Sequence, residues 1–471
     1  MKYWQRAIAL GVFLSCGVSA DAMSLREAVS LSVYSNPEVG EAIFNRNAIG
    51  FELKQAEGQW LPRLDLEVRG GVEWFDEPST RQDNKYLYGP YEIGVRGQQK
   101  VFDGFATTYE IERQRARLDA TSYRVWERSE FVGLSAVRSY LDVARLQAVQ
   151  DAARRNINYH LRIASDMRAG LSRGAVSVAD VQQANERVLA AKLALEEAVE
   201  EQELSKALFL EIVGKPISKA QRIPAQGRRI PSGYEAVLAQ ARANNPLISL
   251  RNADIDAANA QVKIAEADYY PTVDLEVSSR FGENLQGEVG TKADARASLV
   301  MRWNLFNGNI TKNRRAEEIE RAGEARMRSQ QAYREVARET RESWIRRNEL
   351  NKQIGLLTRQ VETTRQLLVS YEEQFTVGQR SLLDVLDTQN TVFRSEVAKI
   401  SAEYAYLFTE YRLLAAMGRM LDVLGIQPPA QAASGFRRLR DDEDTGRTLP
   451  GSALPGLSAQ WRRGSPYTAR P

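Results

Sequence analysis

The sequence of 471 residues has very few of the side chains on which most enzyme chemistry depends. It contains one cysteine, Cys16, and one histidine, His160. Once a leader that includes Cys16 is removed, no thiol remains for disulfides, nucleophilic attack or thiolate metal sites. His160 has no second histidine with which to share a metal, and we find no phosphate-binding glycine loop and no nucleophile elbow. We therefore predict a protein that is not an enzyme and that holds no cofactor and no metal.

Long hydrophobic runs and an excess of one charge are missing as well. Hydrophobic residues make up 43% of the chain and the mean hydropathy is -0.43. No internal run approaches the roughly 18 to 20 apolar residues of a spanning helix, which excludes a helical inner-membrane protein. The formal net charge is only +3, from 64 basic and 61 acidic residues. The chain therefore lacks the overall field that would recruit nucleic acid.

The first 22 residues have the layout of a secretory signal peptide. Lys2 and Arg6 precede an apolar stretch that is too short for an anchor helix, and small residues follow it. We predict export, with cleavage after Ala20 or Ala22. The alternative is a lipoprotein acylated at Cys16, which the residues before this cysteine disfavour.

Short motifs of the first half of the chain return in the second half. Asn36-Pro37 recurs as Asn245-Pro246 at an offset of 209 residues. At an offset of 204, Phe102-Asp103-Gly104 pairs with Phe306-Asn307-Gly308, and Gly174-x-x-Ser177-x-x-Asp180-Val181 pairs with Gly378-x-x-Ser381-x-x-Asp384-Val385. These matches indicate a tandem duplication. We divide the chain into a signal peptide (1–22), a first repeat (23–213), a linker (214–232), a second repeat (233–426) and a disordered C-terminal tail (427–471).

Each half is predicted to hold a helix, a β-hairpin and a long helical pair. The hairpins, at about 62–103 and 271–307, alternate apolar and charged residues with the period of a strand. The long helices would each reach on the order of 100 Å at about 1.5 Å per residue. We place these helices at about 105–168 and 310–375, and the shorter return helices at about 176–213 and 382–424.

The hairpins give four strands with one apolar face, which are too few to close a barrel of about eight strands. Unpaired strand edges are costly in hydrocarbon, so other chains must complete the sheet. Three copies would give twelve strands with an apolar outer face and a charged, wet lumen. Aromatic side chains flank the apolar bands as an interfacial belt would, among them Trp74, Tyr91, Phe281 and Trp303. The alternative is a soluble amphipathic sheet that caps a helical domain.

Taken together, these features resemble the TolC-type outer-membrane factor family. The most specific stretch is Val377-Gly378-Gln379-Arg380-Ser381-Leu382-Leu383-Asp384-Val385-Leu386-Asp387, and the resemblance covers about residues 24–425. It implies a mainly α chain with a pair of membrane β-hairpins. Three chains would form a homotrimer whose twelve-stranded β-barrel, four strands per chain, continues into a long periplasmic α-helical barrel.

The resemblance also implies a function. The chain would be the exit duct of a tripartite pump in the outer membrane of a Gram-negative bacterium, in contact with outer-membrane lipid. Its partners would be a periplasmic adaptor (membrane fusion protein) and an inner-membrane pump of the ABC or RND type. The cargo would be a protein, by type I secretion, or drugs and toxic compounds, by efflux. A structural periplasmic coiled-coil protein tethered to the envelope is the alternative.

By the same resemblance, one turn of the second repeat would carry the pore gate. Asp384 and Asp387 lie three apart on one helical face and would form stacked carboxylate rings around a threefold axis. Asp384 can equally be the capping partner of Ser381. Arg380 and Phe375 would hold the gate shut, although the family often has tyrosine where this chain has Phe375.

Comparison of the two halves supports this assignment, because the gate positions differ while the scaffold motifs are kept. The first-half counterparts of Asp387, Arg380 and Phe375 are Gln183, Val176 and Leu171. The two turns would also form the tips that an adaptor contacts, through Gly174, Gly378 and Val377.

Overall fold

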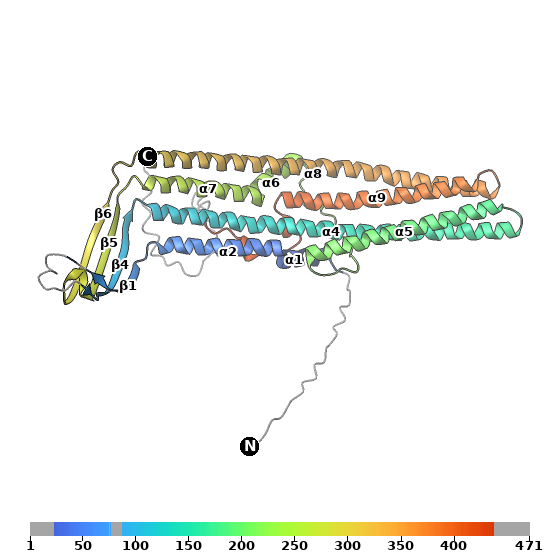
Figure 1. Ribbon diagram of the computed structural model, residues 1–471. Coiled ribbons are helices and arrows are strands. Elements are labelled where there is room, and N and C mark those ends of the chain that lie inside the picture. The colour runs from blue at the N-terminus through green and yellow to red at the C-terminus, as the bar shows by residue number, and fades with distance from the viewer. Residues whose placement is uncertain (1–22, 75, 77–86, 438–471) are drawn as a thin grey trace, which may run out of the picture. The chain divides into compact units, whose positions relative to one another are not determined.

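The computed structural model describes residues 23–74, 76 and 87–437 (Figure 1). The predicted signal peptide, with cleavage at Ala20 or Ala22, lies outside these residues, as does the tail beyond Arg437. The chain divides into two compact units. The first unit contains the described residues up to Phe51 together with Thr121–Ile255 and Glu320–Ala432, and the second contains Glu52–Ala120, Asp256–Ile319 and the residues from Ala433.

The helices follow the same order in both halves of the chain. The first half holds α1 (Leu25–Ser35), α2 (Pro37–Gly58), α4 (Ala106–Ser172) and α5 (Val178–Val213). The second half holds α6 (Tyr234–Asn244), α7 (Pro246–Ala267), α8 (Ile310–Thr376), α9 (Leu382–Ala416) and α10 (Met420–Val423). Short 3-10 turns occur at Gly227–Arg229, Leu285–Gly287 and Ala430–Ala432.

The second return helix is shorter than the sequence predicts. Instead of one helix from 382 to 424, α9 ends at Ala416 and α10 begins at Met420. Gly418 separates them with a φ of 64°, and a side chain there would put Cβ 2.5 Å from the carbonyl oxygen of Asn244. The chain therefore reverses at a position that only glycine fits.

The repeated Asn-Pro motif joins consecutive helices to a return helix. Asn36 separates α1 from α2, and its Nδ2 donates to the carbonyl of Ile212 at 3.0 Å. Asn245 separates α6 from α7, and its Nδ2 donates to the carbonyl of Ala416 at 2.9 Å. The proline that follows is suited to a first helical position. The duplication thus preserves a contact between helix ends.

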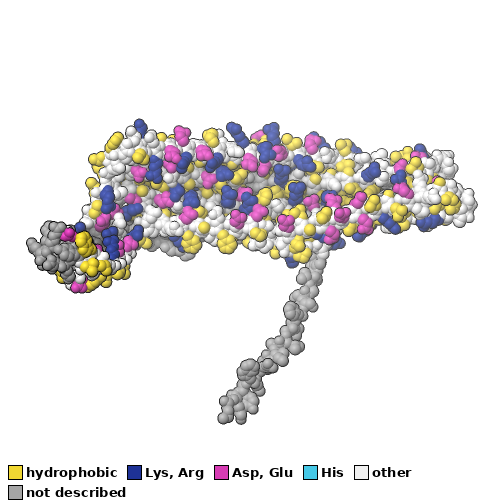
Figure 2. Space-filling model, viewed as in Figure 1, with side chains coloured by type: hydrophobic (Ala, Val, Ile, Leu, Met, Phe, Trp, Pro, Cys, Tyr) yellow, Lys and Arg dark blue, Asp and Glu magenta, His cyan; other side chains and the backbone are white. Residues whose placement is uncertain are grey.

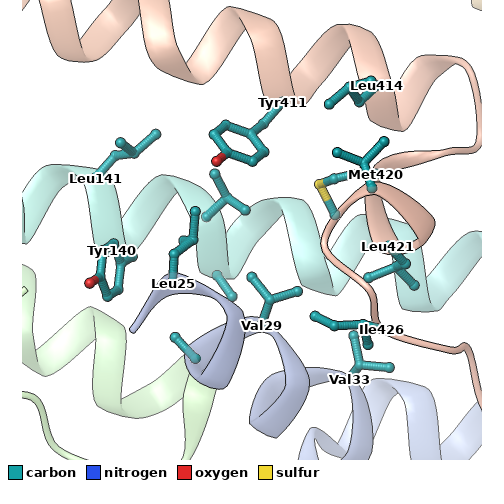
Figure 3. Packing of buried hydrophobic residues seen from close by; sticks show 14 of the residues in the cluster. Leu25, Val29, Val33, Tyr140, Leu141, Tyr411, Leu414, Met420, Leu421 and Ile426 are labelled. Atoms are coloured by element: carbon teal, nitrogen blue, oxygen red, sulfur yellow. The ribbon is translucent and has the colours of Figure 1, made fainter. Parts of the chain in front are cut away.

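The main core of the first unit draws apolar side chains from both halves of the chain. Figure 3 shows Leu25, Val29 and Val33 of α1 between residues of α4 and the segment around α10. The hydroxyl of Tyr140 donates to the carbonyl of Met23 at 2.7 Å, so this buried ring keeps a partner for its polar end. The predicted linker contributes Ile217 and Ile230 to the same core.

The C-terminal segment is ordered further than the sequence predicts. The tail was expected to lack structure from Gln427, yet in the first unit Ala432 packs in a small cluster with Ala42 and Val125. In the second unit the Asp119 carboxylate accepts the backbone N–H groups of Gly435, Phe436 and Arg437 at 2.9, 3.2 and 2.5 Å. A buried carboxylate with three backbone donors can hold a segment that has no periodicity of its own.

The second unit contains a four-stranded antiparallel sheet. Its strands are β1 (Arg63–Gly70), β4 (Tyr91–Asp103), β5 (Thr272–Glu283) and β6 (Thr291–Arg302), in the order β1-β4-β5-β6. The two hairpins of the chain thus join edge to edge through β4 and β5 (Figure 1).

The first predicted hairpin contains a break. Its first strand, β1, ends at Gly70, and Glu73–Trp74 form a separate strand, β2, which pairs with β3 (Leu87–Tyr88). Gly70 and Gly71 interrupt the alternation, and glycine in a strand favours such a break.

Each hairpin leads into its long helix through the repeated Phe-Asp-Gly or Phe-Asn-Gly motif. Asp103 Oδ2 accepts the backbone N–H of Thr107 at 2.9 Å, and Asn307 Nδ2 donates to Thr311 Oγ1 at 2.7 Å. Gly104 and Gly308 both have positive φ, 64° and 67°. The motif therefore combines a reversal of the chain with a polar contact to the first turn of the helix.

None of the described helices combines the length and the apolar character that a membrane-crossing helix needs. On the face shown in Figure 2, basic and acidic side chains alternate along the helices without a large patch of either sign.

Candidate functional site

The sheet of the second unit has one apolar face and one charged face. The register places Leu66 opposite Val95, and Leu275 opposite Leu299. All of these side chains are exposed, as are other large apolar residues of this face, among them Leu64, Val68, Ile93, Val277 and Met301. A monomeric soluble protein rarely exposes a continuous patch of this kind.

The opposite face carries charges that are paired across strands. Arg302 of β6 reaches Asp274 at 3.1 Å and Glu276 at 2.8 Å on β5. Arg280 of β5 reaches Asp294 of β6 at 3.1 Å. Such a face suits a wet surface, whereas the apolar face suits a lipid or protein environment.

The predicted aromatic belt residues lie toward the ends of the strands. Tyr91 at the start of β4 and Phe281 near the end of β5 have ring centroids 6.5 Å apart. Trp303 follows the last residue of β6, and its Nε1 donates to the carbonyl of Tyr269 at 3.1 Å. Trp74 lies in β2 and is 66% exposed.

The two turns of the first unit have the same backbone design. Gly174 and Gly378 have φ of 71° and 74°. Each long helix ends in a Schellman motif, in which one backbone N–H reaches a carbonyl five residues back. In the first turn Ala175 N donates to Gly170 O, and in the second Gln379 N donates to Gln374 O, at 2.9 Å each. A side chain at either glycine would meet nothing within 4 Å, and Val377 beside Gly378 is 67% exposed. All three predicted tip residues therefore lie in open turns.

The side chains around these turns differ between the halves. In the first turn Val176 packs on Gly170, where an added Cβ would lie 3.1 Å from Val176 Cγ2. In the second turn the matching residues are Arg380 and Gln374, and Arg380 Nε donates to Gln374 Oε1 at 3.2 Å. The side-chain contact across the turn is therefore apolar in the first half and polar in the second, although the two turns have the same backbone conformation.

Arg380 makes two further contacts within its own chain. Its Nη1 lies 3.8 Å from Asp384 Oδ2, and its guanidinium carbon lies 4.2 Å from the ring centroid of Tyr371. Tyr371 was not identified from the sequence, although its position one helical turn before Phe375 puts both on one face of α8. Phe375 itself packs against two apolar clusters, around Leu386 and around Val385.

Asp384 is a cap and an exposed carboxylate at the same time. Ser381 Oγ donates to Asp384 Oδ2 at 2.8 Å and accepts the backbone N–H of Asp384 at 3.2 Å, which completes a capping box for α9. Asp180 makes the same box with Ser177 at α5. The side chain of Asp384 is still 42% exposed. The two alternatives left open by the sequence are therefore compatible.

Asp387 has a partner that the sequence did not reveal. Its Oδ1 accepts from Arg187 Nη2 of α5 at 2.8 Å. This pair joins positions 200 residues apart, so no local spacing could have shown it. Within the described part of the chain, no group of three or more His, Asp or Glu side chains is placed to hold a metal ion.

A polypeptide whose sheet exposes an apolar face, and whose helices carry mixed charge and a specialised turn, has the construction of an outer-membrane duct. The family model "Outer membrane efflux protein" matches residues 28–211 and 237–419, which is more than half of the chain. The chain belongs to the outer membrane efflux protein family.

Characterised relatives include efflux and secretion proteins. The outer membrane efflux protein BepC of Brucella suis is 26% identical over 340 residues, which cover 71% of this chain and 74% of BepC. The outer membrane protein TolC of Escherichia coli is 22% identical over 437 residues, 88% of this chain and 86% of TolC. The alkaline protease secretion protein AprF of Pseudomonas aeruginosa is 24% identical over 420 residues, 84% of each chain.

Solved structures give the same fold. CusC, described with transmembrane channel formation, has a TM-score of 0.74 at 16% identity and covers 83% of this chain and 91% of its own. The outer membrane protein VceC of Vibrio cholerae has a TM-score of 0.72 at 17% identity, covering 84% of this chain and 96% of its own. These findings confirm the predicted TolC-like fold class, the outer-membrane localisation and the function as a duct for efflux or secretion.

Proposed function

We propose that three copies of this chain form a duct that conducts cargo passively across the outer membrane. The cargo would arrive from an inner-membrane pump of the ABC or RND type through a periplasmic adaptor. The observation that carries the proposal is the sheet, with its exposed apolar face, its charged face, and the outer edges of β1 and β6 unpaired among the described strands.

The dimensions of the strands support a membrane location. β5 and β6 have 12 residues each, or about 40 Å at roughly 3.4 Å per residue. With a tilt of about 35 to 45° they cross the apolar band of about 25 Å that such barrels present to lipid.

The number of copies follows from the charged face. Two copies would supply eight strands, and a barrel of about eight strands has an interior that side chains fill. The arginine and carboxylate side chains of β5 and β6 need water, so the lumen must be wider. Three copies give twelve strands and a wet interior.

The mass of the detergent-solubilised protein tests the assembly. Light scattering with the detergent contribution subtracted should give three mature chains, each with the 53.0 kDa of the full sequence less the mass of the cleaved signal peptide. A monomer that is stable in detergent would contradict the shared barrel. Fractionation separates the duct from a structural periplasmic protein, because only the duct should need detergent for extraction from the outer membrane.

We place the gate of this duct at the second turn, with Phe375, Arg380, Asp384 and Asp387. The support is the divergence of this turn from the first on an unchanged backbone. Three copies would bring six carboxylates around the threefold axis, which attract cations and constrict the pore. Asp384→Ala combined with Asp387→Ala should raise single-channel conductance and weaken block by Mg²⁺. Unchanged block would remove both residues from the pore.

The turns with Gly174, Gly378 and Val377 are the proposed contact for the adaptor, because they are open and exposed. Relatives named for efflux and for protease secretion both match the chain, so either class of cargo fits its scaffold. Deleting the gene and measuring both drug susceptibility and the secreted proteins would distinguish them.

A further inference from the structure

Arg187 connects the candidate gate to the first half of the chain. It lies on α5, and its ion pair with Asp387 joins α5 to α9. The Arg187 side chain is 27% exposed, whereas the Asp387 side chain is 56% exposed. The guanidinium is therefore held within the helix packing, while the carboxylate is open to solvent.

The surroundings of Arg187 leave its positive charge available to Asp387. The nearby His160 is 3% exposed, and its Nδ1 has no hydrogen-bond partner among the described residues. Burial, together with the charge of Arg187, lowers the pKa of His160 to about 4. The imidazole is therefore neutral at pH 7 and adds no charge to the cluster.

A second acidic side chain lies close to Arg187 but is less well placed. Glu186 Oε2 is 3.6 Å from Arg187 Nε, compared with 2.8 Å between Arg187 Nη2 and Asp387. Glu186 is also 63% exposed. The shorter, hydrogen-bonded contact makes Asp387 the principal partner of this guanidinium.

Each gate carboxylate therefore has an arginine of its own chain. Asp384 has Arg380 at 3.8 Å and Asp387 has Arg187 at 2.8 Å. These four charges sum to zero in every chain. A cation that approaches the ring would meet carboxylates that are already paired, and a fixed positive charge beside a site weakens cation binding.

We infer that Arg187 sets the cation affinity of the gate by neutralising Asp387 within each chain. The inference rests on the proposed function, since it assumes that Asp387 faces the pore of a trimer. Ion pairs with an exposed partner contribute little to stability. The role of Arg187 is accordingly electrostatic: it determines how much negative potential the carboxylate ring presents.

The test is block of single channels in planar bilayers by Mg²⁺ and by La³⁺ added from the side of the gate. Arg187→Gln exposes three unpaired carboxylates in a trimer, and the half-blocking concentration should fall about tenfold. Arg187→Lys keeps the charge and should retain block close to that of the wild type. Arg187→Gln combined with Asp387→Asn should lose the gain in affinity.

A matched control is available on α4. Arg168 is exposed and donates to Asn185 Oδ1 at 2.6 Å, and it forms no ion pair among the described residues. Arg168→Gln removes the same charge near the same turn and should leave block unchanged. An equal effect of the two glutamine variants would show a general loss of positive potential and overturn the inference.

The outcomes separate this inference from the proposed function. If the wild type forms no pore, or if Asp384→Ala with Asp387→Ala leaves block unchanged, the proposed gate fails. If that double variant weakens block but Arg187→Gln leaves it at the wild-type value, the gate stands and the role of Arg187 is refuted.

Discussion

The guanidinium of Arg380 lies over the ring of Tyr371, 4.2 Å from its centroid, and so connects the turn before α9 to the last part of α8. Phe375, one helical turn later, has no hydroxyl with which to contact this arginine. The ring of Tyr371 instead restrains Arg380 through a cation–π contact.

Tyr371→Leu should remove the cation–π contact with Arg380 and favour the open state of the proposed gate. A cation–π contact at such a site is worth about 0.5 to 1 kcal/mol, so the open probability should rise about 2- to 5-fold per copy. Tyr371→Phe keeps the ring and should behave as the wild type in single-channel recordings. If the phenylalanine variant opens as readily as the leucine variant, ring stacking is not what restrains Arg380.

The two roles of Asp384 can be separated by two substitutions. Asp384→Asn removes the charge but keeps an oxygen that can accept from Ser381, whereas Asp384→Ala removes both. Both should weaken Mg²⁺ block equally. Only the alanine variant should also lower stability, by about 1 kcal/mol for a lost cap, measured as thermal loss of helical circular dichroism. Equal stability of the two variants would mean that the capping box does not matter for α9.

The matched glycines after the hairpins should respond differently to substitution. Both have positive φ, but a Cβ at Gly104 would lie 2.5 Å from the carbonyl oxygen of Ala267, whereas at Gly308 it would meet nothing within 4 Å. Gly308→Ala should cost about 1 kcal/mol, the usual penalty of the left-handed region.

Gly104→Ala should cost clearly more, because backbone atoms must move as well. The yield of folded trimer and its dissociation temperature in detergent measure both effects. A similar loss for both variants would contradict the difference in packing that the structure shows.

The sequence predicted the elements well where periodicity or repetition recorded them. The alternation of apolar and charged residues predicted the hairpins, and the absence of proline predicted the long helices. The internal repeat predicted the order of these elements. Sequence reasoning did not predict features that depend on a single residue or on a partner far away in the chain. Gly70 and Gly71 end β1 before Trp74, and Asp119 orders a segment without pattern by accepting three backbone N–H groups.

The residues of the proposed gate show the same limit. Comparison of the halves singled out Arg380 and Asp387 because their counterparts differ. It could not pair Asp387 with Arg187, since that contact depends on how α5 packs against α9 and not on any spacing along the chain.

A buried carboxylate in the core of the first unit should make the stability depend on pH. Glu130 of α4 is 4% exposed, and its Oε1 accepts from the backbone N–H of Leu421 at 3.5 Å. Its Oε2 has no hydrogen-bond partner among the described residues. Burial raises the pKa of Glu130 to about 8, and the charge of Asp422 acts in the same direction, whereas hydrogen bonds from Trp126 and from the backbone of Met420 and Leu421 oppose it.

The direction of this pH dependence follows from how many protons the folded and unfolded states bind at Glu130. Between about pH 4.5 and 8 the folded protein keeps the proton on Glu130, whereas the unfolded chain releases it. The folded state therefore binds more protons in this window, and stability falls as the pH rises through it. Glu130→Gln stays neutral and keeps an acceptor for Leu421, so it should remove this contribution and be more stable than the wild type at pH 8.5, by about 5 kcal/mol at roughly 1.4 kcal/mol per pKa unit.

The measurement is the denaturation temperature of the detergent-solubilised protein between pH 5 and pH 9. Glu127→Gln serves as the control, because Glu127 is on the same helix but 25% exposed and close to Arg128. The control should keep the pH slope of the wild type, whereas Glu130→Gln should flatten it. A slope that is identical in all three proteins would mean that Glu130 is charged in the folded core, and that a group outside the described contacts compensates its charge.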